Sequence, residues 1–66
     1  MKNSKTLPNG SVINLDLITT IHKNDSFDLF GNRVFQVVYE IGNDTYREDF
    51  KTVKERDERF NYLVHL

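Results

Sequence analysis

A strict alternation of apolar and polar side chains, followed by a tight-turn dipeptide, is the feature of this sequence that most constrains its fold. In residues 34–41 the odd positions are Phe, Val, Tyr and Ile, which are aromatic or β-branched. Successive side chains of a strand point to opposite faces, so these four side chains form one apolar face. Gly42 and Asn43 follow directly, and both tolerate the positive φ that two-residue hairpin turns require. The stretch therefore predicts a β-hairpin.

The aromatic residues define the register of this hairpin. A two-residue turn brings Tyr39 opposite Tyr46 and Phe35 opposite Phe50 on the apolar face. A slip by one residue would move Tyr46 and Phe50 to the polar side, so the pattern favours a single register. The opposite face of the two strands then carries Gln36, Val38, Glu40, Thr45, Arg47 and Asp49.

An earlier pair, Gly31-Asn32, predicts a turn before this hairpin and a third strand leading into it. A two-residue loop there would bring Asp28 onto the apolar face that carries Phe35. A three-residue loop at 31–33 instead places Leu29 opposite Phe35 and Phe27 opposite Val37. We favour the three-residue loop, because it keeps one face apolar across three strands.

The N-terminal part begins with a turn signal, Leu-Pro-Asn-Gly-Ser at 7–11, in which proline and glycine suit successive corner positions. A short hairpin pairing 5–7 with 11–14 is expected around it. The apolar residues of 13–17 keep period two, and the period breaks after Leu17. We predict a bend or bulge near Asp16 and a strand at 19–21.

Residues 16–22 allow an alternative interpretation, and residues 22–25 are expected to form a connection. A helix over 16–22 is the competing interpretation of the broken period, and the β-favouring residues Thr19, Thr20 and Ile21 argue against it. Residues 22–25 are expected to link this region to the central strands.

The C-terminal segment predicts a helix from about residue 53 to the end. Thr52 is a suitable N-cap and Glu55 follows three residues later, which is a capping box. An apolar stripe at helical spacing consists of Val53, Phe60, Leu63 and Val64, and the outward positions are Arg56, Asp57, Glu58 and Asn61. Phe60, Leu63 and Val64 are expected to rest on the apolar sheet face, and Glu55 to pair with Arg59.

One charged residue conflicts with the pattern. The predicted register places Glu48 on the apolar face of the sheet. A carboxylate there is expected to lie at the rim or to form a salt bridge with a helix residue such as Arg56.

Together these elements predict one α+β domain spanning residues 1–66. It is a small antiparallel β-meander of three to five strands with one C-terminal helix packed on one face. A chain of 66 residues buries only about 60% of its unfolded surface. It contains no cysteine, so a well-packed core or a partner subunit must supply the stability that disulfides provide elsewhere.

Composition argues against several functional classes. The nine basic and ten acidic residues are mixed along the chain, whereas nucleic-acid binders carry a basic excess or a basic patch. No apolar run approaches the roughly 20 residues of a membrane span, and the N-terminus lacks the apolar core of a signal peptide, so we expect a cytoplasmic protein. The layout resembles many short bacterial and phage reading frames in size and texture.

Catalytic chemistry finds no support in the residue pattern. No nucleophile frame surrounds any serine or threonine, and His22 and His65 are far apart in sequence and interpreted as surface residues. No catalytic residue, metal site or cofactor is predicted, because no ligand cluster or phosphate-binding glycine loop is present.

Protein binding is the remaining expectation. We predict a non-catalytic inhibitor or adaptor of phage or mobile-element type that acts on a larger bacterial protein. The predicted contact surface is the polar face Gln36, Val38, Glu40, Thr45, Arg47 and Asp49, and open sheet edges also offer strand addition to a partner or a second copy. A single-stranded nucleic-acid binder and a structural dimer are the alternatives.

Overall fold

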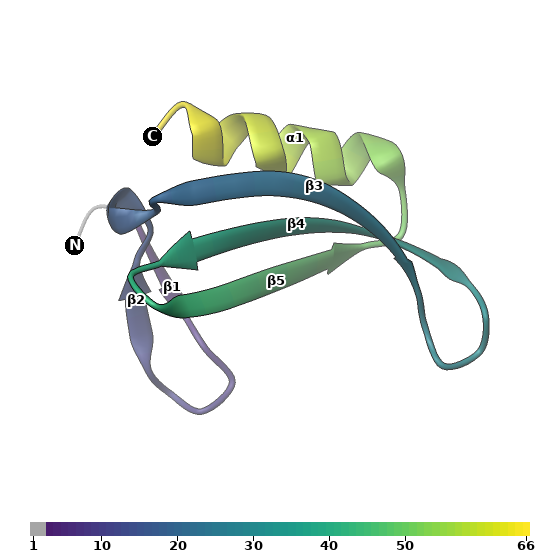
Figure 1. Ribbon diagram of the computed structural model, residues 1–66, viewed down its shortest axis with the longest axis horizontal. Helices are drawn as coiled ribbons and strands as arrows, with labels where there is room; N and C mark the ends of the chain where they lie inside the picture. The colour runs from purple at the N-terminus through teal and green to yellow at the C-terminus, as the bar shows by residue number, and fades with distance from the viewer. Residues whose placement is uncertain (1–2) are drawn as a thin grey trace.

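The computed structural model describes residues 3–66, which form two antiparallel sheets and one α-helix (Figure 1). The elements are β1 (Ser4–Thr6), β2 (Val12–Asn14), the 3₁₀ turn η1 (Leu15–Leu17), β3 (Thr20–Phe27), β4 (Arg33–Ile41), β5 (Asp44–Phe50) and α1 (Val53–Val64). β1 pairs with β2, and β3, β4 and β5 form a three-stranded sheet in that order. The predicted α+β class with a C-terminal helix against the sheet is confirmed.

The β4–β5 hairpin has the predicted register. Tyr39 lies opposite Tyr46 and Phe35 opposite Phe50. The two tyrosine rings stack with centroids 5.8 Å apart. Gly42 has φ of +63°, the left-handed conformation that a tight hairpin turn requires and that glycine adopts without strain.

The predicted loop between β3 and β4 is wrong. β3 ends at Phe27 and β4 begins at Arg33, so the loop has the five residues 28–32. Phe35 therefore lies opposite Asp25, and Val37 opposite Lys23. Residues 22–25, predicted as a link, lie inside β3.

The cause of this shift is the side chain of Asp28. One of its carboxylate oxygens accepts hydrogen bonds from the backbone N–H groups of Phe30 and Asn32, at 2.8 and 2.9 Å. The backbone closes the loop as well, because the Asp28 N–H donates to the Asn32 carbonyl at 2.9 Å. A short aspartate side chain that bonds its own local backbone stabilises a turn that strand alternation does not predict.

The N-terminal region follows the prediction closely. Lys5 lies opposite Ile13 in the β1–β2 hairpin, around the expected turn. The bend near Asp16 is the 3₁₀ turn η1, capped by the Asn14 side chain, which accepts a hydrogen bond from the Asp16 N–H at 3.0 Å. The alternative helix over 16–22 is wrong, because β3 begins at Thr20.

The core lies between one face of the three-stranded sheet and the two segments that cover it, α1 and the N-terminal segment β2–η1. Its buried apolar residues are Leu15, Val37, Tyr39 and Leu63, and the residues that pack around them are Ile13, Ile18, Ile21, Ile41, Tyr46, Phe50 and Phe60. α1 supplies Leu63 and Phe60, while β2 and η1 supply Ile13 and Leu15. The N-terminal segment and the helix therefore cover the same sheet face together.

The helix contacts the sheet along a narrower line than predicted. Leu63 is 5% exposed, whereas Val64 and Val53 are 50% and 44% exposed and do not rest on the sheet. Arg56, predicted to face outward, is buried and takes a position one turn before Phe60 on the contact line. The prediction for Arg56, Val53 and Val64 is thus corrected.

Burial of the Arg56 guanidinium is compensated by two carboxylates. Its Nη1 lies 3.1 Å from Asp25 Oδ1 and its Nε 2.8 Å from Asp57 Oδ1. The guanidinium also lies over the Phe35 ring, 5.7 Å from the centroid. The hydrogen bond to Asp57 raises the pKa of Arg56. A charged group can remain buried in this way because it is paired and hydrogen-bonded.

Glu48 lies on the apolar face, as the register requires, and forms a cluster of four polar side chains. Its carboxylate accepts hydrogen bonds from Arg59 at 2.8 and 3.2 Å and from the Tyr39 hydroxyl at 2.7 Å, and lies 2.9 Å from Lys5 Nζ. The helix partner is therefore Arg59 and not Arg56. Arg59 bonds to Glu48 in place of the predicted partner Glu55.

The capping box yields a first testable prediction. The Thr52 hydroxyl oxygen accepts a hydrogen bond from the Glu55 N–H at 3.2 Å at the start of α1. Thr52→Ala should lower the free energy of unfolding by about 1 kcal/mol, because it leaves a helix N–H unpaired. Thr52→Ser keeps the hydroxyl and should stay near the native value. Urea unfolding followed by circular dichroism compares the two variants, and equal stabilities would contradict the cap.

Candidate functional site

The six residues predicted as a contact surface lie together on one face of the sheet, opposite to the face that α1 covers. Cross-strand pairing joins them as Gln36 with Asp49, Val38 with Arg47 and Glu40 with Thr45. β3 extends this face with Thr20, His22, Asn24 and Ser26. We call these residues the open face.

Side-chain hydrogen bonds run across all three strands of the open face. Asn24 Nδ2 donates to Gln36 Oε1 at 2.8 Å, and Gln36 Nε2 donates to Asp49 Oδ1 at 2.9 Å. The chain of bonds orients the Gln36 amide and holds Asp49 close to the strand. Because these polar groups already hydrogen-bond to one another, they have fewer hydrogen bonds to offer a partner.

Val38 does not contribute the apolar contact expected of it. It is 4% exposed, although it lies on the uncovered face. Its cross-strand neighbours are His22 and Arg47, both exposed. The open face therefore presents no apolar side chain at its centre, and it lacks the exposed apolar anchor typical of strong protein interfaces.

Large apolar side chains are exposed to solvent at the loop end of the β3–β4 hairpin. Leu29 is 101% exposed and Phe30 88% exposed, and Phe27 at the end of β3 is 69% exposed. We call Leu29 and Phe30 the apolar tip. Figure 1 shows that the loop carrying them projects beyond the rest of the sheet.

The loop that carries the apolar tip is closed by its own hydrogen bonds. In addition to the bonds of the Asp28 carboxylate, the Gly31 N–H donates to the Asp28 carbonyl at 3.1 Å, and Gly31 has φ of +83°. The backbone hydrogen bond from Asn32 lowers the pKa of Asp28. The tip is thus presented in a defined loop conformation, although its two side chains contact little of the protein.

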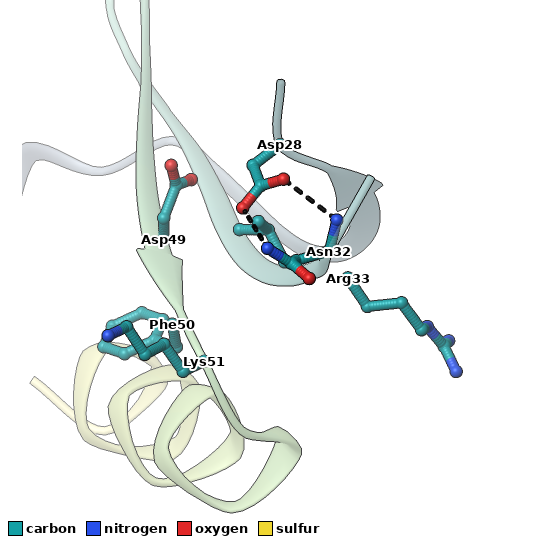
Figure 2. A pocket seen from close by; sticks show the side chains of 7 residues that line it. Asp28, Asn32, Arg33, Asp49, Phe50 and Lys51 are labelled. Carbon is teal, nitrogen blue, oxygen red and sulfur yellow. Dashed lines mark hydrogen bonds between the residues drawn. The ribbon is translucent and has the colours of Figure 1, made fainter. Parts of the chain in front are cut away.

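A hollow of about 500 Å³ lies beside the apolar tip, between the β3–β4 loop and the end of β5 (Figure 2). Its lining consists of Asp28, Asn32, Arg33, Val34, Asp49, Phe50 and Lys51. Figure 2 shows Asp28 bonded to Asn32 on one side of the hollow, with Phe50 and Lys51 on the other. A partner seated on the tip would meet a concave surface of mixed charge next to it.

The groups considered for catalysis lie apart. His22 is on the open face, and His65 follows α1, where its Nδ1 lies 2.6 Å from the Asn61 carbonyl oxygen. Glu48 and Asp49 point to opposite faces of β5, as strand alternation predicts. Residues 3–66 contain no group of three side chains suited to a metal ion. Over the same residues, no helix is long and apolar enough to cross a membrane.

Comparison with protein-family models, curated proteins and solved structures found no match to this chain. Within residues 3–66, the open face and the apolar tip are the two surfaces that bear on function. Sequence reasoning identified the open face and missed the apolar tip, which it placed partly on the covered face through Leu29. The signal was present as Asp28 followed by Gly31 and Asn32, because an aspartate and a glycine at that spacing favour a longer, side-chain-closed loop.

Proposed function

We propose that this chain is a non-catalytic protein-binding module that occupies a surface of a larger protein as an inhibitor or adaptor. The observation that carries the proposal is the apolar tip, where Leu29 and Phe30 are almost fully exposed on a hydrogen-bonded loop. Exposed apolar residues of this size are the usual anchors of protein interfaces. A loop already held in shape loses little conformational entropy on binding, which favours affinity.

The surrounding charges support a protein partner over a nucleic acid. The chain carries a net charge of −1, and the hollow beside the tip contains Asp28 and Asp49 together with Arg33 and Lys51. Binding to a phosphate backbone requires a basic surface, which this region does not form. The open face would then act as a polar rim around the anchor. The cytoplasmic location and the phage or mobile-element origin stay predictions from the sequence.

Affinity capture from the source cells tests the proposal with a matched pair of variants. Leu29→Ser combined with Phe30→Ser removes the tip, and Leu17→Ser removes an exposed leucine, 59% accessible, on η1. We expect one protein to be captured in stoichiometric amount by the native chain and by Leu17→Ser, and to be lost with the tip variant. With that protein purified, calorimetry should show at least about 30-fold weaker binding by the tip variant, as loss of an interface anchor predicts.

Two outcomes would contradict the proposal. Equal capture by all three proteins would show that the tip is not the anchor. Sub-micromolar, salt-sensitive binding of a labelled single-stranded oligonucleotide would favour the nucleic-acid alternative.

A further inference from the structure

The outer edge of β5 carries backbone groups that are free to pair. Ile41 and Asp44 flank the two-residue turn and form its closing hydrogen-bonded pair, so alternate residues of β5 from Asp44 onward bond to β4. The Thr19 N–H donates to the Glu40 carbonyl at 2.9 Å, which confirms that the even residues of β4 face β3. Thr45, Arg47 and Asp49 therefore direct their N–H and C=O groups away from the sheet. All three are exposed, and none has a backbone partner within residues 3–66.

The charged side chains along the two sheet edges differ in whether they are free to form ion pairs with a partner. On β3, Lys23 is paired with Asp57 at 3.2 Å and Asp25 with Arg56 at 3.1 Å, so both are engaged by α1. On β5, Arg47 forms no ion pair within residues 3–66, and Asp49 accepts a hydrogen bond from Gln36 alone among them. α1 contacts all three strands of the sheet from one face, and Figure 1 shows β3 and β5 as its two edges.

We propose that two copies of this chain pair antiparallel through β5, with Arg47 of each copy opposite Asp49 of the other. Only outward-directed residues can form the new hydrogen-bonded pairs. A register with Arg47 opposite itself forms one like-charge pair and no opposite-charge pair. A register with Thr45 opposite Arg47 forms two like-charge pairs, Asp44 with Glu48, and again no opposite-charge pair. The proposed register instead forms two opposite-charge pairs, related by the two-fold axis.

The remaining charges near the axis are compatible with this register. Glu48 meets its own counterpart there, on the covered face, and in each copy Lys5 and Arg59 already balance that carboxylate. Pairing would join two three-stranded sheets into a continuous six-stranded one. A chain of this length gains stability from such association, because its own core is small.

Charge reversal tests the register. The native chain is expected to dimerise with a dissociation constant on the order of 10–100 μM, since an edge contact of this size is below the standard interface. Arg47→Asp places two aspartates opposite each other and should weaken the dimer by at least about tenfold. Arg47→Asp combined with Asp49→Arg exchanges the two charges and should restore the native constant to within about threefold. Sedimentation equilibrium measures all three proteins, and urea unfolding verifies that each is folded.

Hydrogen exchange locates the contact. Protection of the Thr45, Arg47 and Asp49 amides should rise with protein concentration, while that of the outward amides of β3 stays constant. A chain that is monomeric up to about 1 mM, beyond the weak-interface range, would overturn the proposal. A dimer unaffected by Arg47→Asp, or a double variant that stays as weak as the single one, would also overturn it. The inference is independent of the proposed function, and the Leu29→Ser, Phe30→Ser variant should dimerise as the native chain does.

Discussion

Replacing Leu63 with alanine is expected to lower the free energy of unfolding by about 3 kcal/mol, within the range measured for buried leucines. Leu63 is 5% exposed and packs in the same cluster as Leu15, Val37 and Tyr39. Removal of its side chain leaves a cavity beneath the last turn of α1, where the helix meets the sheet and η1. A domain of 66 residues has roughly 3–10 kcal/mol of stability in total, so this substitution should remove between about a third and all of it.

Val64 provides the matched control for this prediction. It is the next residue of the same helix and is 50% exposed. Val64→Ala should change the free energy of unfolding by less than about 0.5 kcal/mol, because it removes no core contact. Urea unfolding monitored by circular dichroism compares both variants with the native chain. Equal losses from the two substitutions would mean that the helix rests on the sheet through the whole stripe.

The second large effect is expected from Glu48→Gln, which should cost about 3 kcal/mol. The side chain of Glu48 is 10% exposed and touches Arg59, Lys5 and the Tyr39 hydroxyl. A neutral amide leaves the partly buried guanidinium and ammonium groups without their counter-charge. Glu58→Gln, at an exposed position of the same chain, should be nearly neutral. Similar losses from both substitutions would contradict a special role for the Glu48 cluster.

The same cluster makes stability depend on pH. Burial raises the pKa of Glu48, but hydrogen bonds from Arg59, Tyr39 and Lys5 outweigh it and lower the pKa to about 2. Because the folded pKa lies below the unfolded value, this stabilisation is fully present above about pH 5 and is lost as the pH falls toward 2. The difference in unfolding free energy between the native chain and Glu48→Gln should therefore shrink steadily over that interval. A difference independent of pH would show that ionisation of Glu48 does not stabilise the fold.

Local rules were sufficient for the parts of the fold in which neighbouring signals agree. The β4–β5 hairpin combined strand alternation, a Gly-Asn turn and two aromatic pairs, and all three favoured one register. The start of α1 was equally predictable, since Thr52 and Glu55 form the expected cap. The six residues of the predicted contact surface share a face because strand alternation alone dictates it.

Other features depend on contacts that sequence spacing does not reveal. The length of the β3–β4 loop is determined by the Asp28 carboxylate, whose hydrogen bonds override the continuity of the apolar face. Arg56 is buried because Asp25 and Asp57 converge on it from two different elements. Val38 is buried although it lies on the polar face, between the cross-strand neighbours His22 and Arg47. In each case a tertiary arrangement overrules a preference read from one segment.

In the β3–β4 loop, the residues that stabilise the conformation differ from those that are exposed, and this has an evolutionary consequence. Asp28, Gly31 and Asn32 close the loop, so the side chains at the two positions between them contribute almost nothing to folding. Selection can replace the side chains at 29 and 30 while the scaffold stays intact. Under the proposed function, related chains would differ in their targets mainly through these two positions, and a new recognition dipeptide could be grafted there without redesign of the domain.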